Sequence, residues 1–249
     1  MGEPIIRIQQ WLETPPGQYL LAWERAQFDR AVADIFGYHA LQIGVHGFDT
    51  LAMNRMPHKW LARLAGNTDN QSGALVTDPA ALPFSEASLD LVALPHTLEL
   101  SHDPHATLRE VARVLVPEGR VVISGLNPAS LWGLRQRRAK LTKRVGFGEL
   151  FLPESGEFIA PWRLRDWLRL LSFEVETSHY GCYRPAITSE KWLRRYEWMD
   201  KAGARSWPIF GAAYFFVAVK RVRGMRLIGP AWKSSKALAN APVSIARKG

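Results

Sequence analysis

The chain has 249 residues, a length that fits one domain with additions. Its apolar content of 47% and charged content of 22% are close to globular averages, so the composition excludes a disordered chain. The longest apolar run near the end, 212–219, is far shorter than the roughly 20 residues of a spanning helix, and we expect no membrane span. The start lacks a secretory pattern and the single cysteine, Cys182, cannot form an internal disulfide, so we expect a cytoplasmic protein.

The positive charge is concentrated at one end of the chain. The formal net charge is +9, but residues 220–249 alone contain eight basic residues and no acidic one. The sequence therefore predicts a nearly neutral domain over residues 1–225 and a basic, flexible tail over residues 226–249. Such a tail attracts phosphate without reading sequence, so a weak contact with nucleic acid through the tail is one open alternative.

The first part of the chain predicts a helix, a strand and a glycine turn. Apolar residues recur at helical spacing over 18–36, and a short apolar strand follows over 39–43. The next turn contains Gly44 and Gly47, and glycines let a backbone approach a ligand closely. Residues 56–64 fit a strand or a helix. The passage to the following strand is short, so we expect one covering helix to be reduced or lost.

The middle of the chain predicts buried parallel strands with polar residues at their carboxyl ends. Strand 74–77 ends at Asp78, and strand 88–94 ends at the segment Pro95-His96-Thr97. In open α/β sheets, these positions face the crevice where ligands bind. Asp103 and Pro104 then form a strong helix start, since Asp caps a helix and Pro fits its first position.

The remaining elements are predicted from periodicity and from Pro and Gly signals. We expect a strand over 120–124, a basic helix over 131–144, a helix from Pro161, and strands over 173–177 and 212–219. Between the last two strands, a segment at about residues 180–208 is rich in aromatic and basic residues. Such a composition suits a substrate lid, although aromatic residues at helical spacing also build ordinary cores.

The stretch from Asp78 to Pro128 resembles the class I S-adenosylmethionine-dependent methyltransferases of the type 11 group. The resemblance extends over roughly 18–220. The shared pieces occur in the same order and are Asp78 with Leu82-Pro83-Phe84, Leu89-Asp90-Leu91-Val92, Leu98-Glu99-Leu100, Asp103-Pro104, and Arg113-Val114-Leu115-Val116-Pro117-Glu118-Gly119.

The resemblance implies an α/β fold, a Rossmann-like doubly wound sheet of seven strands. The sheet is expected to be mostly parallel, with one antiparallel edge strand at 212–219. The implied cofactor is S-adenosylmethionine, and the implied activity is methyl transfer. We expect a small-molecule methyl acceptor, which no motif identifies.

The resemblance also implies site residues, for each of which a structural role is the alternative. Asp78 would accept a hydrogen bond from the adenine amino group, and the other implied cofactor-binding residues are Gly44, Pro79, Ala80, Pro95, His96 and Thr97. His96 is the best candidate for a catalytic base because it follows a strand at the ligand edge. His102 and Glu99 are weaker candidates, and no metal site is expected.

The first glycine motif departs from the family pattern. An acid is usual two residues before the first glycine, but this chain has Gln42, and the later glycines are replaced by His46 and Phe48. The acid that binds the ribose has no clear counterpart, and Asp69 is the nearest candidate. Two alternatives therefore stay open: a catalytically inactive, methyltransferase-like binding or regulatory protein, and an RNA-modifying methyltransferase that uses the basic segments.

Overall fold

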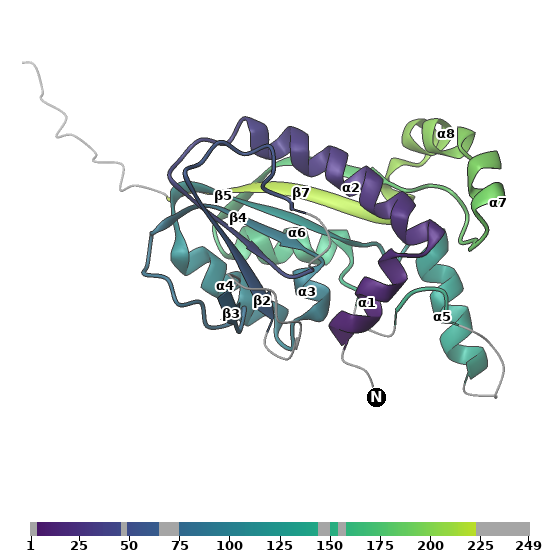
Figure 1. The fold of residues 1–249 in the computed structure, drawn as a ribbon, viewed down its shortest axis with the longest axis horizontal. Helices are drawn as coiled ribbons and strands as arrows, with labels where there is room; N and C mark the ends of the chain where they lie inside the picture. The colour runs from purple at the N-terminus through teal and green to yellow at the C-terminus, as the bar shows by residue number, and fades with distance from the viewer. Residues whose placement is uncertain (1–3, 46–48, 65–74, 144–149, 154–157, 223–249) are drawn as a thin grey trace, which may run out of the picture.

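The computed structural model describes residues 4–45, 49–64, 75–143, 150–153 and 158–222. These residues build one seven-stranded sheet with helices on both faces (Figure 1). The strand order is β3-β2-β1-β4-β5-β7-β6. The strands are β1 (His39–Ile43), β2 (His58–Leu64), β3 (Leu75–Thr77), β4 (Leu89–Pro95), β5 (Leu115–Leu126), β6 (Phe173–Gly181) and β7 (Ala213–Lys220). The open segment 56–64 thus contains a strand.

The predicted fold class is confirmed, and the place of the antiparallel strand is refined. Strands β3, β2, β1, β4 and β5 pair in parallel, whereas β7 runs antiparallel to both β5 and β6. Contrary to our prediction, β7 is not outermost, because β6 lies beyond it. The reason is visible in burial: β7 is buried along nearly its whole length and needs a strand on each side, whereas β6 has exposed positions along its length.

The helices are α1 (Pro4–Leu12), α2 (Pro15–Ala33), α3 (Thr97–Leu100), α4 (Pro104–Val114), α5 (Leu131–Lys143), α6 (Pro161–Leu170), α7 (Glu190–Arg195), α8 (Trp198–Ser206) and the 3₁₀ turn η1 (Pro208–Phe210). Helix α4 begins as the sequence predicted: the Asp103 side chain accepts a hydrogen bond from the backbone N–H of Ala106, and Pro104 follows it. Among the described residues, no helix is long and apolar enough to cross a membrane.

Two apolar cores hold helices against opposite faces of the sheet. Helix α2 packs Phe28 and Val32 on one face, where the Phe28 ring meets Phe215 edge to face at 4.9 Å. Helices α4 and α6 pack on the other face. A third core joins α1 and α2 to the start of α5 at the end of the sheet where β5 ends. This end of the sheet is therefore covered by helices from the start and from the middle of the chain.

The expected loss of a covering helix is confirmed for the described part of the first connection. Residues 49–57 between β1 and β2 contain turns and no helix. Their few buried side chains are held locally, since the Asn54 side chain donates hydrogen bonds to the carbonyls of Val32 and Ile35 at the end of α2. The segments 46–48 and 65–74, and with them His46, Gly47, Phe48 and Asp69, lie outside the described residues, as does the tail 226–249.

Candidate functional site

The predicted site residues lie at the carboxyl ends of the parallel strands. Gly44 follows β1 with a φ of 120°, a conformation that favours glycine. A Cβ atom at Gly44 would lie 2.5 Å from Oγ1 of Thr97 and 2.8 Å from the carbonyl oxygen of Pro95. The Thr97 hydroxyl also donates a hydrogen bond to the carbonyl of Ile43. The ends of β1 and β4 are thus in direct contact, and only a residue without a side chain fits between them.

Gln42, which stands where the family pattern has an acid, anchors the connection that follows β1. Its side chain is buried, and Oε1 accepts hydrogen bonds from the backbone N–H of Thr50 at 2.9 Å and from the Thr50 hydroxyl at 2.8 Å. An amide oxygen accepts these bonds as a carboxylate would, but without a charge. The substitution therefore keeps the connection after β1 anchored while removing a negative charge.

Asp78 lies at the end of β3, at the same edge of the sheet. Its side chain is exposed, and Oδ1 accepts a hydrogen bond from the N–H of Ala80 at 2.9 Å in a tight turn. The next residue, Pro79, is buried. Strands are spaced by about 4.8 Å, so the end of β3 lies roughly 10 Å from the end of β1 across the edge. This separation suits an extended ligand that reaches from Gly44 to Asp78.

The most unusual feature of this edge is a buried cluster of His96, Glu24 and Glu99. Nδ1 of His96 lies 2.9 Å from Glu99, and Nε2 lies 3.0 Å from Glu24, a residue of α2. The His96 and Glu24 side chains have no exposed surface, and Glu99 is 2% exposed. Glu99 also accepts a hydrogen bond from the N–H of Leu126 at the end of β5. The cluster thus joins α2, β4 and β5.

The charges in this cluster keep His96 protonated. Burial lowers the pKa of His96, but the charges of Glu24 and Glu99 outweigh burial and raise the pKa from 6.5 to about 10. Burial has the opposite effect on Glu99, whose pKa it raises. An imidazolium cannot accept a proton, so this geometry does not favour the base role predicted for His96. The alternative His102 is exposed, and Glu99 is engaged within the cluster.

Glu24 was not predicted from the sequence. Its Oε1 lies 3.0 Å from Nε2 of His96, and the charge of this carboxylate is the largest of the effects that raise the pKa of His96. A buried carboxylate is stabilised by a cationic ring at this distance. The available signal was its position, because Leu20, Glu24, Phe28 and Val32 recur every four residues on the buried face of α2.

The predicted lid is attached to α2 next to this cluster. Asp200 of α8 accepts hydrogen bonds from the Tyr19 hydroxyl and from Nε of Arg184, and the Arg184 guanidinium lies 4.3 Å above the Tyr19 ring. Between the lid and α5 is a cavity of about 400 Å³ with a mainly apolar lining. Its residues are Ala129, Ser130, Leu131, Trp132, Leu134, Cys182, Tyr183, Arg184, Trp207, Phe210 and Ala212. Cys182 lies near enough to Glu24 for the carboxylate charge to raise its pKa, after the larger effect of burial.

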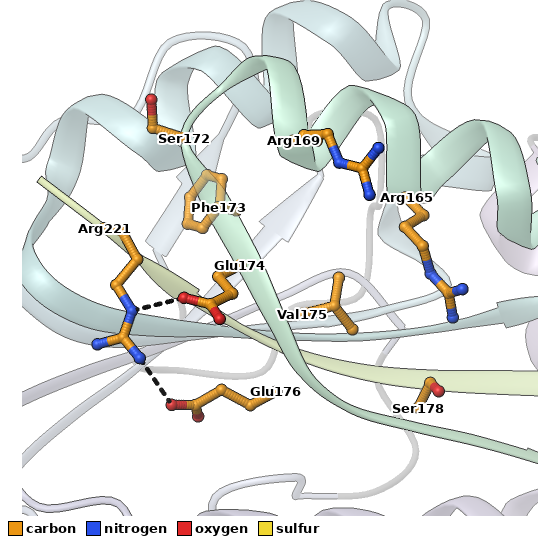
Figure 2. Close-up of a pocket in the computed structure, with 9 residues that line it drawn as sticks. All are labelled: Arg165, Arg169, Ser172, Phe173, Glu174, Val175, Glu176, Ser178 and Arg221. Carbon is orange, nitrogen blue, oxygen red and sulfur yellow. Dashed lines mark hydrogen bonds and ion pairs between the residues drawn. The ribbon is translucent and has the colours of Figure 1, made fainter. Parts of the chain in front are cut away.

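A larger cavity of about 630 Å³ lies at the other end of the sheet. It is formed by α6 and the edge strand β6, and Arg221 pairs there with Glu174 and Glu176 (Figure 2). The start of β6 pairs with the end of β7 and therefore lies near the amino end of β5. This cavity is remote from the carboxyl ends where ligands bind in such sheets.

The fold and the matched sequence define the class of protein. Residues 37–123 match the family model described as a methyltransferase domain, Methyltransf_11. The structure of a SAM-dependent methyltransferase from Thermotoga maritima is similar with a TM-score of 0.56 and 15% identity, over 82% of this chain and 94% of that chain. The chain therefore has the fold of the class I S-adenosylmethionine-dependent methyltransferases, and its residues 37–123 match the model of a methyltransferase domain.

Two curated relatives are similar in sequence to parts of the chain. The uncharacterized protein YafS of Escherichia coli (strain K12) is 34% identical over 166 residues, which are 66% of this chain and 65% of YafS. A demethylmenaquinone methyltransferase of Corynebacterium glutamicum (strain R) is 38% identical over 61 residues, 24% of this chain and 26% of the relative. The chain thus spans about 65% of the length of the first relative and about a quarter of the second.

Proposed function

We propose that the protein is an S-adenosylmethionine-dependent methyltransferase that acts on a small-molecule acceptor. The observation that carries the proposal is the contact at Gly44, where a glycine with positive φ lets the end of β1 pack directly against Pro95 and Thr97 at the end of β4. This contact brings the carboxyl ends of two parallel strands together at the edge where ligands bind in such sheets. The match of residues 37–123 to a methyltransferase domain indicates which ligand that is.

Different residues along this edge of the sheet would bind different parts of S-adenosylmethionine. Gly44 and the segment Pro95-His96-Thr97 would hold the methionine end, while Asp78 would accept a hydrogen bond from the adenine amino group, with Pro79 and Ala80 beside the ring. When bound, S-adenosylmethionine supplies a methyl group activated on a positively charged sulfur. Protein groups then need to orient the two reactants and exclude water, so no nucleophile or metal is needed.

The buried cluster would contribute orientation and charge. Glu24 and Glu99 hold His96 from both sides, which fixes the segment that follows β4. His96 has a φ of 53°, a backbone conformation rare for residues with side chains, so these contacts maintain a local strain at the site. Carboxylates at this edge also favour a cationic ligand electrostatically.

The acceptor would bind in the cavity between the lid and α5. Its lining of Trp132, Tyr183, Trp207 and Phe210 suits an aromatic or aliphatic molecule, and Ser130 and Arg184 add a few polar groups. The cavity lies near the cluster of His96, Glu24 and Glu99, because Cys182 lines the cavity and the charge of Glu24 helps to raise the pKa of its thiol.

Titration calorimetry with S-adenosylmethionine and its demethylated product tests the proposal. We expect saturable binding that Asp78→Ala weakens by about 10- to 100-fold, since a hydrogen bond to a charged group is worth about 1.5–3 kcal/mol. Asp166→Ala, which removes an exposed carboxylate on α6, is the matched control and should leave binding unchanged. Absence of heat up to millimolar ligand would leave the inactive, methyltransferase-like binding protein as the better description.

A further inference from the structure

Helix α5 has apolar side chains on two opposite faces. Trp132 and Ala139 are buried in the protein, whereas Leu131, Leu134 and Leu141 are 51%, 52% and 64% exposed. At about 100° per residue, the three leucines lie within roughly 80° of one another, and far from the buried face. An ordinary surface helix places polar residues there. The exposed leucine stripe therefore has no function in the core of the described protein.

The lid extends this apolar surface. Trp207 and Phe210 are 41% and 48% exposed, and with Leu131 and Leu134 they line the same cavity of about 400 Å³. The leucine stripe and the two lid aromatics are thus neighbours around one opening. We call these five residues, Leu131, Leu134, Leu141, Trp207 and Phe210, the α5–lid face. Contiguous exposed apolar surface of this kind marks an interaction site.

The charges around the α5–lid face are positive. Helix α5 contains five basic residues and no acidic one. Arg135 is engaged with the protein, since it donates a hydrogen bond to the carbonyl of Ala186 and lies 4.9 Å from the Phe151 ring centroid. Arg137, Arg138 and Lys140 are exposed. An exposed leucine stripe beside basic residues, with tryptophan at its border, complements a surface that is apolar inside and anionic outside.

We propose that the α5–lid face docks the protein on an anionic lipid bilayer. Leucines enter the acyl boundary, Trp207 lies at headgroup level, and the basic side chains contact lipid phosphates. Nucleic acid would use the basic residues but gain nothing from three aliphatic side chains, since it is bound through charge and stacking. The cavity mouth then opens toward the bilayer, so an apolar acceptor reaches it from lipid. This entry of an acceptor rests on the proposed function.

Vesicle cosedimentation of the full chain, without cofactor, tests the docking surface. We expect binding to vesicles of phosphatidylcholine with phosphatidylglycerol that is at least tenfold stronger than to phosphatidylcholine alone. The double variant Leu131→Ser/Leu134→Ser should weaken binding to the mixed vesicles by tenfold or more. The matched control is Leu170→Ser, which changes a leucine that is 81% exposed on α6 and should have no effect.

A second pair of variants examines the charges. Arg137→Glu/Lys140→Glu should reduce the preference for anionic vesicles by tenfold or more, whereas Arg163→Glu/Arg169→Glu on α6 should retain most of it. Attraction through the basic tail is common to all variants, so each comparison isolates the face. Equal vesicle binding by the wild type and the leucine variant would overturn the proposal, as would RNA binding without vesicle binding. Neither result would affect the calorimetric test of cofactor binding.

Discussion

Raising the pH should destabilise the protein through the buried cluster of His96, Glu24 and Glu99. The pKa of His96 is about 10 in the folded protein and 6.5 in an unfolded chain. The folded state therefore holds this proton more tightly. The stabilisation is complete below pH 6.5 and is lost as the pH rises through about 10. A tenfold change in proton affinity is worth about 1.4 kcal/mol, so the total effect is about 5 kcal/mol.

Glu24→Gln tests the cause of this pH dependence. The variant keeps the size and shape of the side chain but removes the charge that contributes most to raising the pKa of His96. The pKa of His96 should fall, and the loss of stability between pH 6.5 and about 10 should shrink by a large part of its wild-type value. The variant should also be less stable than the wild type at pH 6.5, since it leaves a buried imidazolium with one carboxylate fewer.

Urea unfolding followed by tryptophan fluorescence at several pH values measures both quantities, because the chain has ten tryptophans. Glu13→Gln, an exposed glutamate shortly before α2, is the matched control and should show the wild-type slope. Parallel curves for the wild type and Glu24→Gln would refute the reasoning. So would an NMR titration in which the His96 ring is neutral at about pH 8.

Two further predictions concern single side chains at the site. Gly44→Ala should lower the free energy of unfolding by about 1–3 kcal/mol and weaken cofactor binding at least tenfold, since its Cβ would lie 2.5 Å from the Thr97 hydroxyl at a φ of 120°. Thermal melts and calorimetry measure these two effects, and a variant as stable as the wild type would contradict the close packing of Gly44 against Thr97. Burial raises the pKa of the Cys182 thiol well above its usual value, so a disulfide reagent at about pH 8 should react with the native protein far more slowly than with the unfolded chain, and rapid labelling of the native protein would show that the thiol is accessible.

Local signals predicted several of the elements that the structure contains. Strand 39–43 and the start of α4 at Pro104 were predicted correctly, because each depends on neighbouring residues: a short apolar run in one case and a capping Asp with Pro in the other. The ordered motif series from Asp78 onward predicted the sheet topology, apart from the position of β7. That position depends on pairing with β6 at long range, which an apolar run alone does not specify.

The features missed from the sequence are those made by distant segments. Periodicity identified the helix that contains Glu24, but it did not show that this carboxylate meets His96 across the end of the sheet. The period of α5 likewise leaves open which of its two apolar faces is buried. Only the packing of Trp132 against the Trp11 and Phe151 rings shows that the leucine stripe is the exposed one.

The altered glycine motif is therefore compatible with a working cofactor site. Gln42 keeps the acceptor oxygen that anchors the connection after β1, so the local structure does not need the missing charge. A carboxylate at this end of the sheet is supplied by Glu24, which comes from α2 instead of β1 and lies 3.0 Å from His96. Helix α2 also contacts the segment predicted as a lid, since the Tyr19 hydroxyl donates a hydrogen bond to Asp200 of α8. One helix therefore links the buried cluster to that segment.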